Sequence, residues 1–167
     1  LFMCGSRPTH FFNLLPLITE TVQEIKKLQP DFQAKLLVSP FIKKNDFAVY
    51  QEKNNLSEFT IIEQEDSRKI ISQAKLVVTI PGTNNMEIAY LGKPAMVIFP
   101  LNHPEYILFD SVLWYLAKVP LLKQLIFRII INYVSNKKRY FSIVNEMADK
   151  YIYPEITEVI KPQKTAK

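Results

Sequence analysis

The stretch from Ala74 to Asn102 constrains the fold more than any other part of the chain. An apolar, β-branched run over 75–80 predicts a strand, and Pro81-Gly82-Thr83 ends that strand abruptly. A short helix is expected next, closed by Gly92 and its neighbours, and 95–99 reads as a second buried strand. Strand, turn, helix, turn and strand in this order indicate an α/β fold.

The helix inside this stretch has a recognisable start. Asn84 offers a side-chain cap, and Glu87 stands three residues later, where it would complete a capping box. A glycine turn that leads from the carboxyl end of a strand into a helix N-terminus is a common phosphate site, because free N–H groups and the helix dipole converge there. We therefore expect the amides from Thr83 to Asn85 to face an anion.

The beginning of the chain repeats this pattern. Leu1-Phe2-Met3-Cys4 reads as the end of a strand, and Gly5-Ser6-Arg7 reads as the turn after it. Apolar residues then recur at helical spacing as far as Leu28, with Asn13 available as the cap and Pro16 tolerated in the first turn. The guanidinium of Arg7 would meet a diphosphate with a planar fork of donors.

The remaining elements alternate in the same way. Strands are expected over 35–39 and 59–63, a polar helix or loop within 41–56, and a helix from 65 to 74. This alternation predicts a doubly wound, Rossmann-like parallel sheet with strand order 3-2-1-4-5. The two glycine turns would then lie side by side at the switch point of the sheet, where ligands bind in such folds.

Composition narrows the class of partner only slightly. A net charge of +5 favours anionic partners, and one cysteine, Cys4, fits a reducing compartment and a buried, inert thiol. No Cys/His/Asp cluster has metal-ligand spacing, and His10 reads as an ordinary solvated or capping residue. No basic run is interleaved with aromatics, so nucleic-acid binding is not expected. Because Leu1-Phe2-Met3-Cys4 reads as the last residues of a strand whose beginning is missing, we expect a domain cut from a longer polypeptide.

The segment 103–140 differs in character from the rest. It is hydrophobic but interrupted by charges, and within 121–134 its polar residues form one narrow stripe. No uncharged run approaches the roughly 20 residues of a membrane-spanning helix. We expect a hydrophobic, amphipathic helical insertion that lies on a membrane surface or against another domain. The basic tail, 161–167, would add attraction to anionic lipid.

Three patches resemble one family. Cys4-Gly5-Ser6-Arg7 is similar to its first-strand Pro-Gly-Ser-Arg, and SQAKLVVTIPGTNNMEIAYLGKP over 72–94 is similar to its "ASD…L.ASGTATLE…GKP" region. SIVNEMADKYIYPEI over 142–156 is similar to its "SLPNILAG…PEL" segment. The family is lipid-A-disaccharide synthase, a GT-B glycosyltransferase, and the resemblance covers its C-terminal, donor-binding half. An acid of the family is replaced by His10, and the chain looks like a divergent branch.

The resemblance implies transfer of a sugar of the N-acetylglucosamine type from a UDP donor to a lipid-linked acceptor, with inversion and with no cofactor or obligatory metal. By position, Arg7 would contact the diphosphate, Glu87 the ribose hydroxyls, and Asn145 would lie near the diphosphate; Glu155 would begin the last helix. The substrate-binding residues that it predicts are Gly5, Ser6, Arg7, Gly82, Thr83, Asn84, Asn85, Glu87 and Asn145.

The resemblance also implies a division of labour. Residues 1–160 would form the nucleotide-sugar-binding domain, while the acceptor site and the catalytic base belong to an N-terminal half that this sequence lacks. We thus expect no catalytic residue in this chain and no activity of the fragment alone. Its partner would be that half, on the same polypeptide or on another subunit. The complex would be cytoplasmic and peripheral, on the inner, anionic face of the cytoplasmic membrane.

Other interpretations stay open. The chain could be a non-catalytic nucleotide-sugar-binding or membrane-docking module that needs a partner, or a domain of the UDP-sugar 2-epimerase type, against which the greasy 106–134 segment argues. Individual residues also have simpler explanations. Glu87 could only pair with Asn84 in a capping box, Arg7 could be a surface arginine, and Asn145 could be a loop or cap asparagine.

Overall fold

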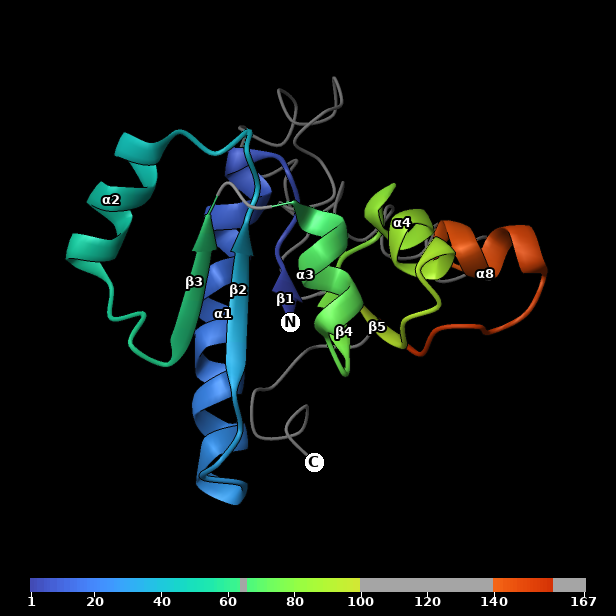
Figure 1. Ribbon diagram of the computed structural model, residues 1–167, viewed down its shortest axis with the longest axis horizontal. Coiled ribbons are helices and arrows are strands. Elements are labelled where there is room, and N and C mark those ends of the chain that lie inside the picture. Colours follow the sequence, from blue (N-terminus) through green and yellow to red (C-terminus); the bar gives the residue numbers. More distant parts are fainter. Residues whose placement is uncertain (64–65, 100–139, 158–167) are drawn as a thin grey trace, which may run out of the picture.

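A computed structural model of the protein describes residues 1–63, 66–99 and 140–157 (Figure 1). Within these residues the chain alternates between strands and helices, as the sequence predicts. The elements are β1 (Phe2–Met3), α1 (Pro8–Leu28), β2 (Ala34–Val38), α2 (Lys44–Lys53), β3 (Phe59–Glu63), α3 (Ser67–Gln73), β4 (Val77–Thr79), α4 (Asn84–Tyr90), β5 (Ala95–Ile98), α8 (Ile143–Ala148) and β6 (Glu155–Ile156).

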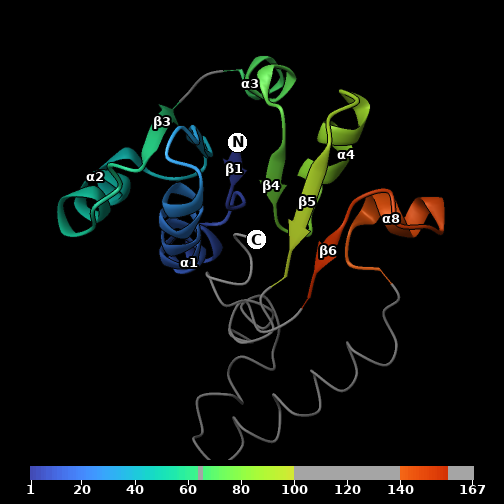
Figure 2. The same ribbon diagram turned by 90° about the horizontal axis from the view of Figure 1, so that it is seen from below.

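The strands form one parallel sheet in the order β3-β2-β1-β4-β5-β6 (Figure 2). The central strand β1 pairs with β2 through Phe2 and Leu36, and with β4 through Phe2–Val78 and Met3–Thr79. The predicted doubly wound order is confirmed, and β6 extends it beyond β5. Because β2 and β4 lie on opposite sides of β1, the switch point of the sheet lies between β1 and β4.

Two apolar clusters cover the two faces of the sheet. Consecutive strand residues point to opposite faces, so Phe2 belongs to one cluster and Met3 to the other, and Ile98 and Val97 divide in the same way. The first cluster packs under α1 and α2, and the second under α3 and α4. Figure 2 shows α1 on one side of the sheet and α3 and α4 on the other. Burial on both faces explains why these strands read as continuous apolar runs.

Helix α1 begins earlier than the sequence suggested. Arg7 is its N-cap residue, with no side-chain capping bond, and Pro8 occupies the first turn, so the prediction of Asn13 as cap is wrong. Pro16 lies inside the helix rather than in its first turn. Phe11 is fully buried, and its packing, together with the fixed φ of Pro8, extends the helix to the end of the β1 turn. The long helix α1 therefore begins directly after the turn that follows β1.

The start of helix α4 also differs in detail. Asn84 is its first residue, and Thr83 is the N-cap residue with no side-chain capping bond, so the predicted capping box of Asn84 and Glu87 is wrong. The end of the helix is as expected, because Gly92 adopts a left-handed φ of +64°. The carboxylate of Glu87 does not form a capping box and instead accepts a hydrogen bond from the Ser67 hydroxyl.

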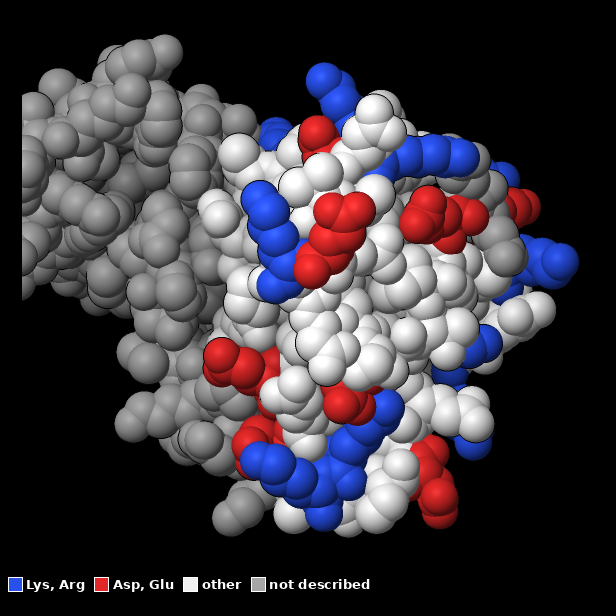
Figure 3. Space-filling model, turned by 90° about the vertical axis from the view of Figure 1, so that its left-hand side faces the viewer, with Lys and Arg blue, Asp and Glu red and all other residues white. Residues whose placement is uncertain are grey.

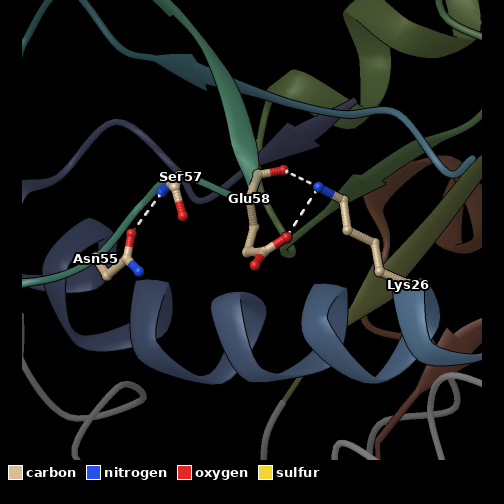
Figure 4. A network of polar contacts seen from close by, with 4 residues as sticks. All are labelled: Lys26, Asn55, Ser57 and Glu58. Atoms are coloured by element: carbon tan, nitrogen blue, oxygen red, sulfur yellow. Dashed lines mark hydrogen bonds and ion pairs between the residues drawn. The ribbon is translucent and has the colours of Figure 1, made fainter. Parts of the chain in front are cut away.

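Polar contacts tie α1 to the start of β3 (Figure 4). The ammonium group of Lys26 lies 2.9 Å from the carboxylate of Glu58 and donates to its backbone carbonyl at 3.0 Å. Beside them the Ser57 amide donates to the Asn55 side chain at 2.9 Å. On the face of the molecule seen in Figure 3, basic and acidic side chains are interspersed rather than gathered into one basic field.

The chain leaves the sheet after β5 and re-enters it at β6. Phe99 and Phe141, on either side of the segment 100–139, stack with ring centroids 4.6 Å apart. Glu155 lies in β6, so the expectation that it begins a helix is wrong; its backbone pairs in parallel with Val97. The hydrophobic insertion expected over 103–140, apart from buried Tyr140, and the basic tail 161–167 lie outside the described residues. None of the helices in the described part is long and apolar enough to cross a membrane.

Candidate functional site

The two glycine turns meet at the carboxyl edge of the sheet. They follow the neighbouring strands β1 and β4, which run in parallel. A Cβ atom placed on Gly5 would lie 2.7 Å from Cδ1 of Ile80, the residue directly after β4. Gly5 also has a φ of +92°, which side chains rarely tolerate. The first turn therefore packs tightly against the beginning of the second, as the strand order predicts.

The β1–α1 turn is suited to an anion. Ser6 and Arg7 are exposed, and α1 starts directly after them with no acidic residue in its first turn. The positive end of this helix is thus uncompensated by a carboxylate of that turn. His10 is partly buried, and its pKa is lowered by desolvation and by the positive charge of Arg7. Because the imidazole of His10 is then neutral at neutral pH, the positive charge at this turn comes from Arg7 and from the N-terminus of α1.

The β4–α4 turn offers space. A Cβ atom placed on Gly82 would meet nothing within 4 Å, and Thr83 beside it is exposed. The backbone amide of Asn85 donates to the Gly82 carbonyl at 3.2 Å, so this amide is used within the turn. Gly82 and Asn84 are both partly buried. The open space beside Gly82 and the exposure of Thr83 make these two residues the side from which a phosphate can approach the turn.

Asn85 does not present its side chain to this space. The residue is fully buried, and its Nδ2 donates to Oγ of Ser142 at 3.3 Å. Its Oδ1 is buried without a hydrogen-bond partner among the described residues. The side chain of Asn85 therefore faces α8 rather than the open side of the turn.

Glu87 lies one turn further along α4, with 30% of its side chain exposed. Its Oε1 accepts a hydrogen bond from the hydroxyl of Ser67 at 3.0 Å and lies 3.6 Å from Nε of Arg68. Both residues belong to the N-terminal end of α3, which Asp66 caps by accepting from the Arg68 amide. Sequence reasoning missed Ser67 and Arg68, because only the sheet order brings the start of α3 beside α4.

Asn145 is fully buried and uses all of its hydrogen-bonding capacity within the chain. Its Nδ2 donates to the Tyr153 carbonyl at 2.8 Å and to Oε1 of Glu155 at 2.7 Å. Its Oδ1 accepts from the amides of Ile152 and Tyr153, both at 2.8 Å. Asn145 therefore ties α8 to the residues that lead into β6, and a direct contact with a diphosphate would have to replace one of these bonds.

The described residues give little support for a nucleophilic cysteine or for a metal site in this region. Burial raises the pKa of the Cys4 thiol to about 12, so the nucleophilic thiolate is scarce at neutral pH and the thiol is an inert part of the core. Within residues 1–63, 66–99 and 140–157, no group of three His, Cys, Asp or Glu side chains could hold a metal ion. The charged group that the described residues offer at the two turns is Arg7.

Comparison with known proteins fits this geometry. The family model described as lipid-A-disaccharide synthetase matches residues 1–121, which include both turns, Glu87 and the first five strands. The chain belongs to the lipid-A-disaccharide synthetase family. The family that the sequence motifs suggested is thereby confirmed, and two of the three motifs, at 4–7 and 72–94, lie within the matched residues.

Curated relatives are similar over the same region. The lipid-A-disaccharide synthase of Geobacter sulfurreducens is 26% identical over 102 residues, and that of Nitrosococcus oceani is 28% identical over 102 residues. The aligned part is 61% of this chain but 26% of each relative, so the chain matches about a quarter of their length. No solved structure matches the chain significantly.

Proposed function

We propose that this chain is the donor-binding half of an inverting, metal-independent glycosyltransferase that uses a UDP-sugar of the UDP-N-acetylglucosamine type. The observation that carries the proposal is the meeting of two glycine turns at the switch point between β1 and β4, with Gly5 packed on Ile80. Membership of the lipid-A-disaccharide synthetase family supports a glycosyltransferase, and the site supports the part of it that binds the nucleotide.

The diphosphate of the donor would lie across the two turns. Arg7 and the N-terminus of α1 supply positive charge from one side, and the open space beside Gly82 and Thr83 lets phosphate oxygens approach from the other. When the glycosidic bond to UDP breaks, these groups would stabilise the charge of the leaving diphosphate. By analogy with oxyanion holes, removing one such donor costs about 2.7–4 kcal/mol in the transition state.

The ribose would be bound by Glu87. Its partly exposed carboxylate lies on α4 beyond the β4–α4 turn, and the Ser67 hydroxyl fixes one of its oxygens. The other oxygen could then accept a hydrogen bond from a ribose hydroxyl. A carboxylate oriented in this way favours a ligand with a hydroxyl group that donates a hydrogen bond. A diphosphate without ribose has no such donor, so Glu87 would not add to its affinity.

The rest of the reaction would take place on other parts of the complete enzyme. The acceptor site and catalytic base are assigned to an N-terminal half, on the same polypeptide or on a partner subunit, so this chain alone would bind donor without transferring sugar. A lipid-linked acceptor, a cytoplasmic location and attachment to the inner face of the membrane are part of the proposal. They rest on the hydrophobic sequence of 103–140 and the basic residues of 161–167.

Calorimetric titration of the 167-residue chain tests the proposal. UDP and UDP-N-acetylglucosamine should bind, and a GDP-sugar should bind more weakly. Arg7→Ala and Glu87→Ala should each weaken UDP binding several-fold or more. Lys27→Ala is the matched control: it removes a cation from the other end of α1, about 30 Å away at 1.5 Å per residue. Unchanged affinity in both site variants would overturn the assignment.

A further inference from the structure

The N-terminus of α8 is occupied by a carboxylate of the chain itself. Glu155, from β6, accepts hydrogen bonds from the backbone amides of Phe141, at 3.0 Å to Oε2, and of Ser142, at 2.8 Å to Oε1. The same Oε1 accepts from Nδ2 of Asn145 at 2.7 Å. The two amides belong to the N-cap residue Ser142 and the residue before it, and the carboxylate places a negative charge at the positive end of the helix.

Asn145 connects Glu155 to two contacts that reach both ends of α4. Through Glu155 it fixes Ser142, whose Oγ accepts from Nδ2 of Asn85 at the start of α4. Through its two bonds to the backbone of Tyr153 it fixes that residue, whose hydroxyl donates to the Lys93 carbonyl, just beyond α4, at 3.2 Å. Figure 1 shows α8 beside α4, in agreement with these contacts.

The contact at Asn85 has a consequence for α4. Its Oδ1 is fully buried and has no partner among the described residues, and exchanging the amide oxygen and nitrogen would only move the deficit to the other atom. A buried amide with one unsatisfied atom favours any movement of α4 that lets water in. The groups around Asn145 oppose that movement at both ends of the helix. Glu87, which lies on α4, keeps its position as a result.

We infer that Asn145 and Glu155 form a positioning pair that holds α4 in place for the nucleotide, and that Asn145 does not itself contact the diphosphate. The inference rests on the proposed function, because α4 carries Glu87 and follows the Gly82 turn. The pair acts on nucleotide affinity through Ser142–Asn85 and Tyr153–Lys93.

A swap of donor and acceptor tests the pair. Asn145→Asp keeps the acceptor for Ile152 and Tyr153 but sets two carboxylates against each other, and it should lower UDP affinity of the 167-residue chain at least roughly ten-fold. Adding Glu155→Gln makes the side chain at 155 neutral and so removes the repulsion between the two carboxylates. An amide nitrogen in the place of Oε1 can donate to the new carboxylate, but it no longer accepts from Ser142, and the Tyr153 carbonyl still faces the carboxylate at 145. The double variant should recover part of the lost affinity and bind UDP at least roughly three-fold more tightly than Asn145→Asp. Glu155→Gln alone is the matched single variant and should show a smaller loss than Asn145→Asp.

The two models predict opposite results for the double variant. If Asn145 contacts the diphosphate directly, a carboxylate at position 145 repels it whatever stands at 155, and the double variant binds UDP no better than Asn145→Asp. That result, or unchanged affinity in Asn145→Asp, would overturn the inference and leave the donor site intact. Absence of UDP binding by the unmodified chain would overturn the proposed function and this inference with it.

Amide hydrogen exchange over 84–93 supplies a readout that does not depend on nucleotide. Protection of α4 should fall in Asn145→Asp and return in part in the double variant. If Asn145→Asp does not fold, the double variant decides: a folded double variant with protected α4 but no UDP binding contradicts the inference, and one that binds UDP supports it.

Discussion

The turn after β1 and the turn after β4 carry the same type of residue for different reasons. Gly5 has a φ of +92° and leaves no room for a Cβ atom, which would lie 2.7 Å from Ile80. Gly82 has no positive φ, and a Cβ atom there would meet nothing within 4 Å. The first glycine is required by the fold of the chain. The second is not, and its open side is where we propose that the phosphates approach.

In the proposed function the two turns have different tasks. The β1 turn packs tightly and would supply the charge of Arg7, and the β4 turn would supply backbone for the phosphates near Glu87. Substitutions at the two glycines should therefore affect different quantities, one the free energy of unfolding and the other nucleotide affinity.

The largest expected effect is that of Gly5→Ala. The positive φ and the contact with Cδ1 of Ile80 should together lower the free energy of unfolding by about 2–5 kcal/mol. Urea unfolding measures it. Combining Gly5→Ala with Ile80→Val removes Cδ1 and should restore the steric part only, leaving the backbone part. A Gly5→Ala chain as stable as the unmodified one would contradict the comparison.

Gly82→Ala should have the opposite profile. Its free energy of unfolding should stay within about 0.5 kcal/mol, because neither φ nor packing opposes a methyl group. UDP affinity should fall roughly ten-fold, since a methyl group in a tight phosphate contact costs about 1–3 kcal/mol. Calorimetry and urea unfolding on the same sample separate the two quantities. Undiminished UDP binding would show that phosphate does not approach this backbone.

Ser67→Ala sharpens the assignment of Glu87 with a smaller effect. Loss of the hydroxyl that donates to Oε1 should leave the carboxylate less well oriented and reduce UDP affinity about two- to ten-fold. Ser72→Ala, on the same helix α3, is the control, because the Ser72 hydroxyl donates to the Lys69 carbonyl at 2.7 Å and not to Glu87. Inorganic pyrophosphate, which has no ribose, should bind both variants equally.

The smallest effect concerns the pH dependence at His10. Burial and Arg7 hold its folded-state pKa below the ordinary 6.5, so the unfolded chain takes up the proton first as the pH falls. Well above pH 6.5 His10 is neutral in both states and does not change the free energy of unfolding. Below pH 6.5 the unfolded chain binds the proton more readily, so the free energy of unfolding falls. Urea unfolding at about pH 7.5 and about pH 5.5 should show a larger loss for the unmodified chain than for His10→Gln. Because a diphosphate beside Arg7 would favour the protonated imidazole, UDP binding should tighten in the same interval.

Much of the sheet was predictable, because its signals are local. The β-branched runs and the alternation of strands and helices gave the five strands and their order, and the region 59–63 matches β3 to the residue. The ends of helices were less predictable. Pro16 suggested a late start for α1, but the burial of Phe11 decided an earlier one. A capping box at Asn84 fits the spacing, yet the nearby Ser67 offers Glu87 a stronger partner.

The side-chain network was beyond the reach of the sequence. Asn145 was legible as a motif residue, and the motif placed it near the diphosphate. Its actual partners come from β6 and the loop before it, and no local pattern announces that Glu155 caps a helix that starts more than ten residues earlier. Contacts of this kind depend on the pairing of β6 with β5, which no periodicity in a two-residue strand reveals.

The stacked rings of Phe99 and Phe141 bear on how this family can vary. Phe99 directly follows β5 and Phe141 lies just before α8, so the chain comes back beside the end of β5 before it forms α8 and β6. For the core, the length of what lies between these rings is almost immaterial, because the entropy of closing a loop grows only slowly with its length. Insertions, deletions or replacement of the residues between the two rings should therefore change the stability of the sheet little.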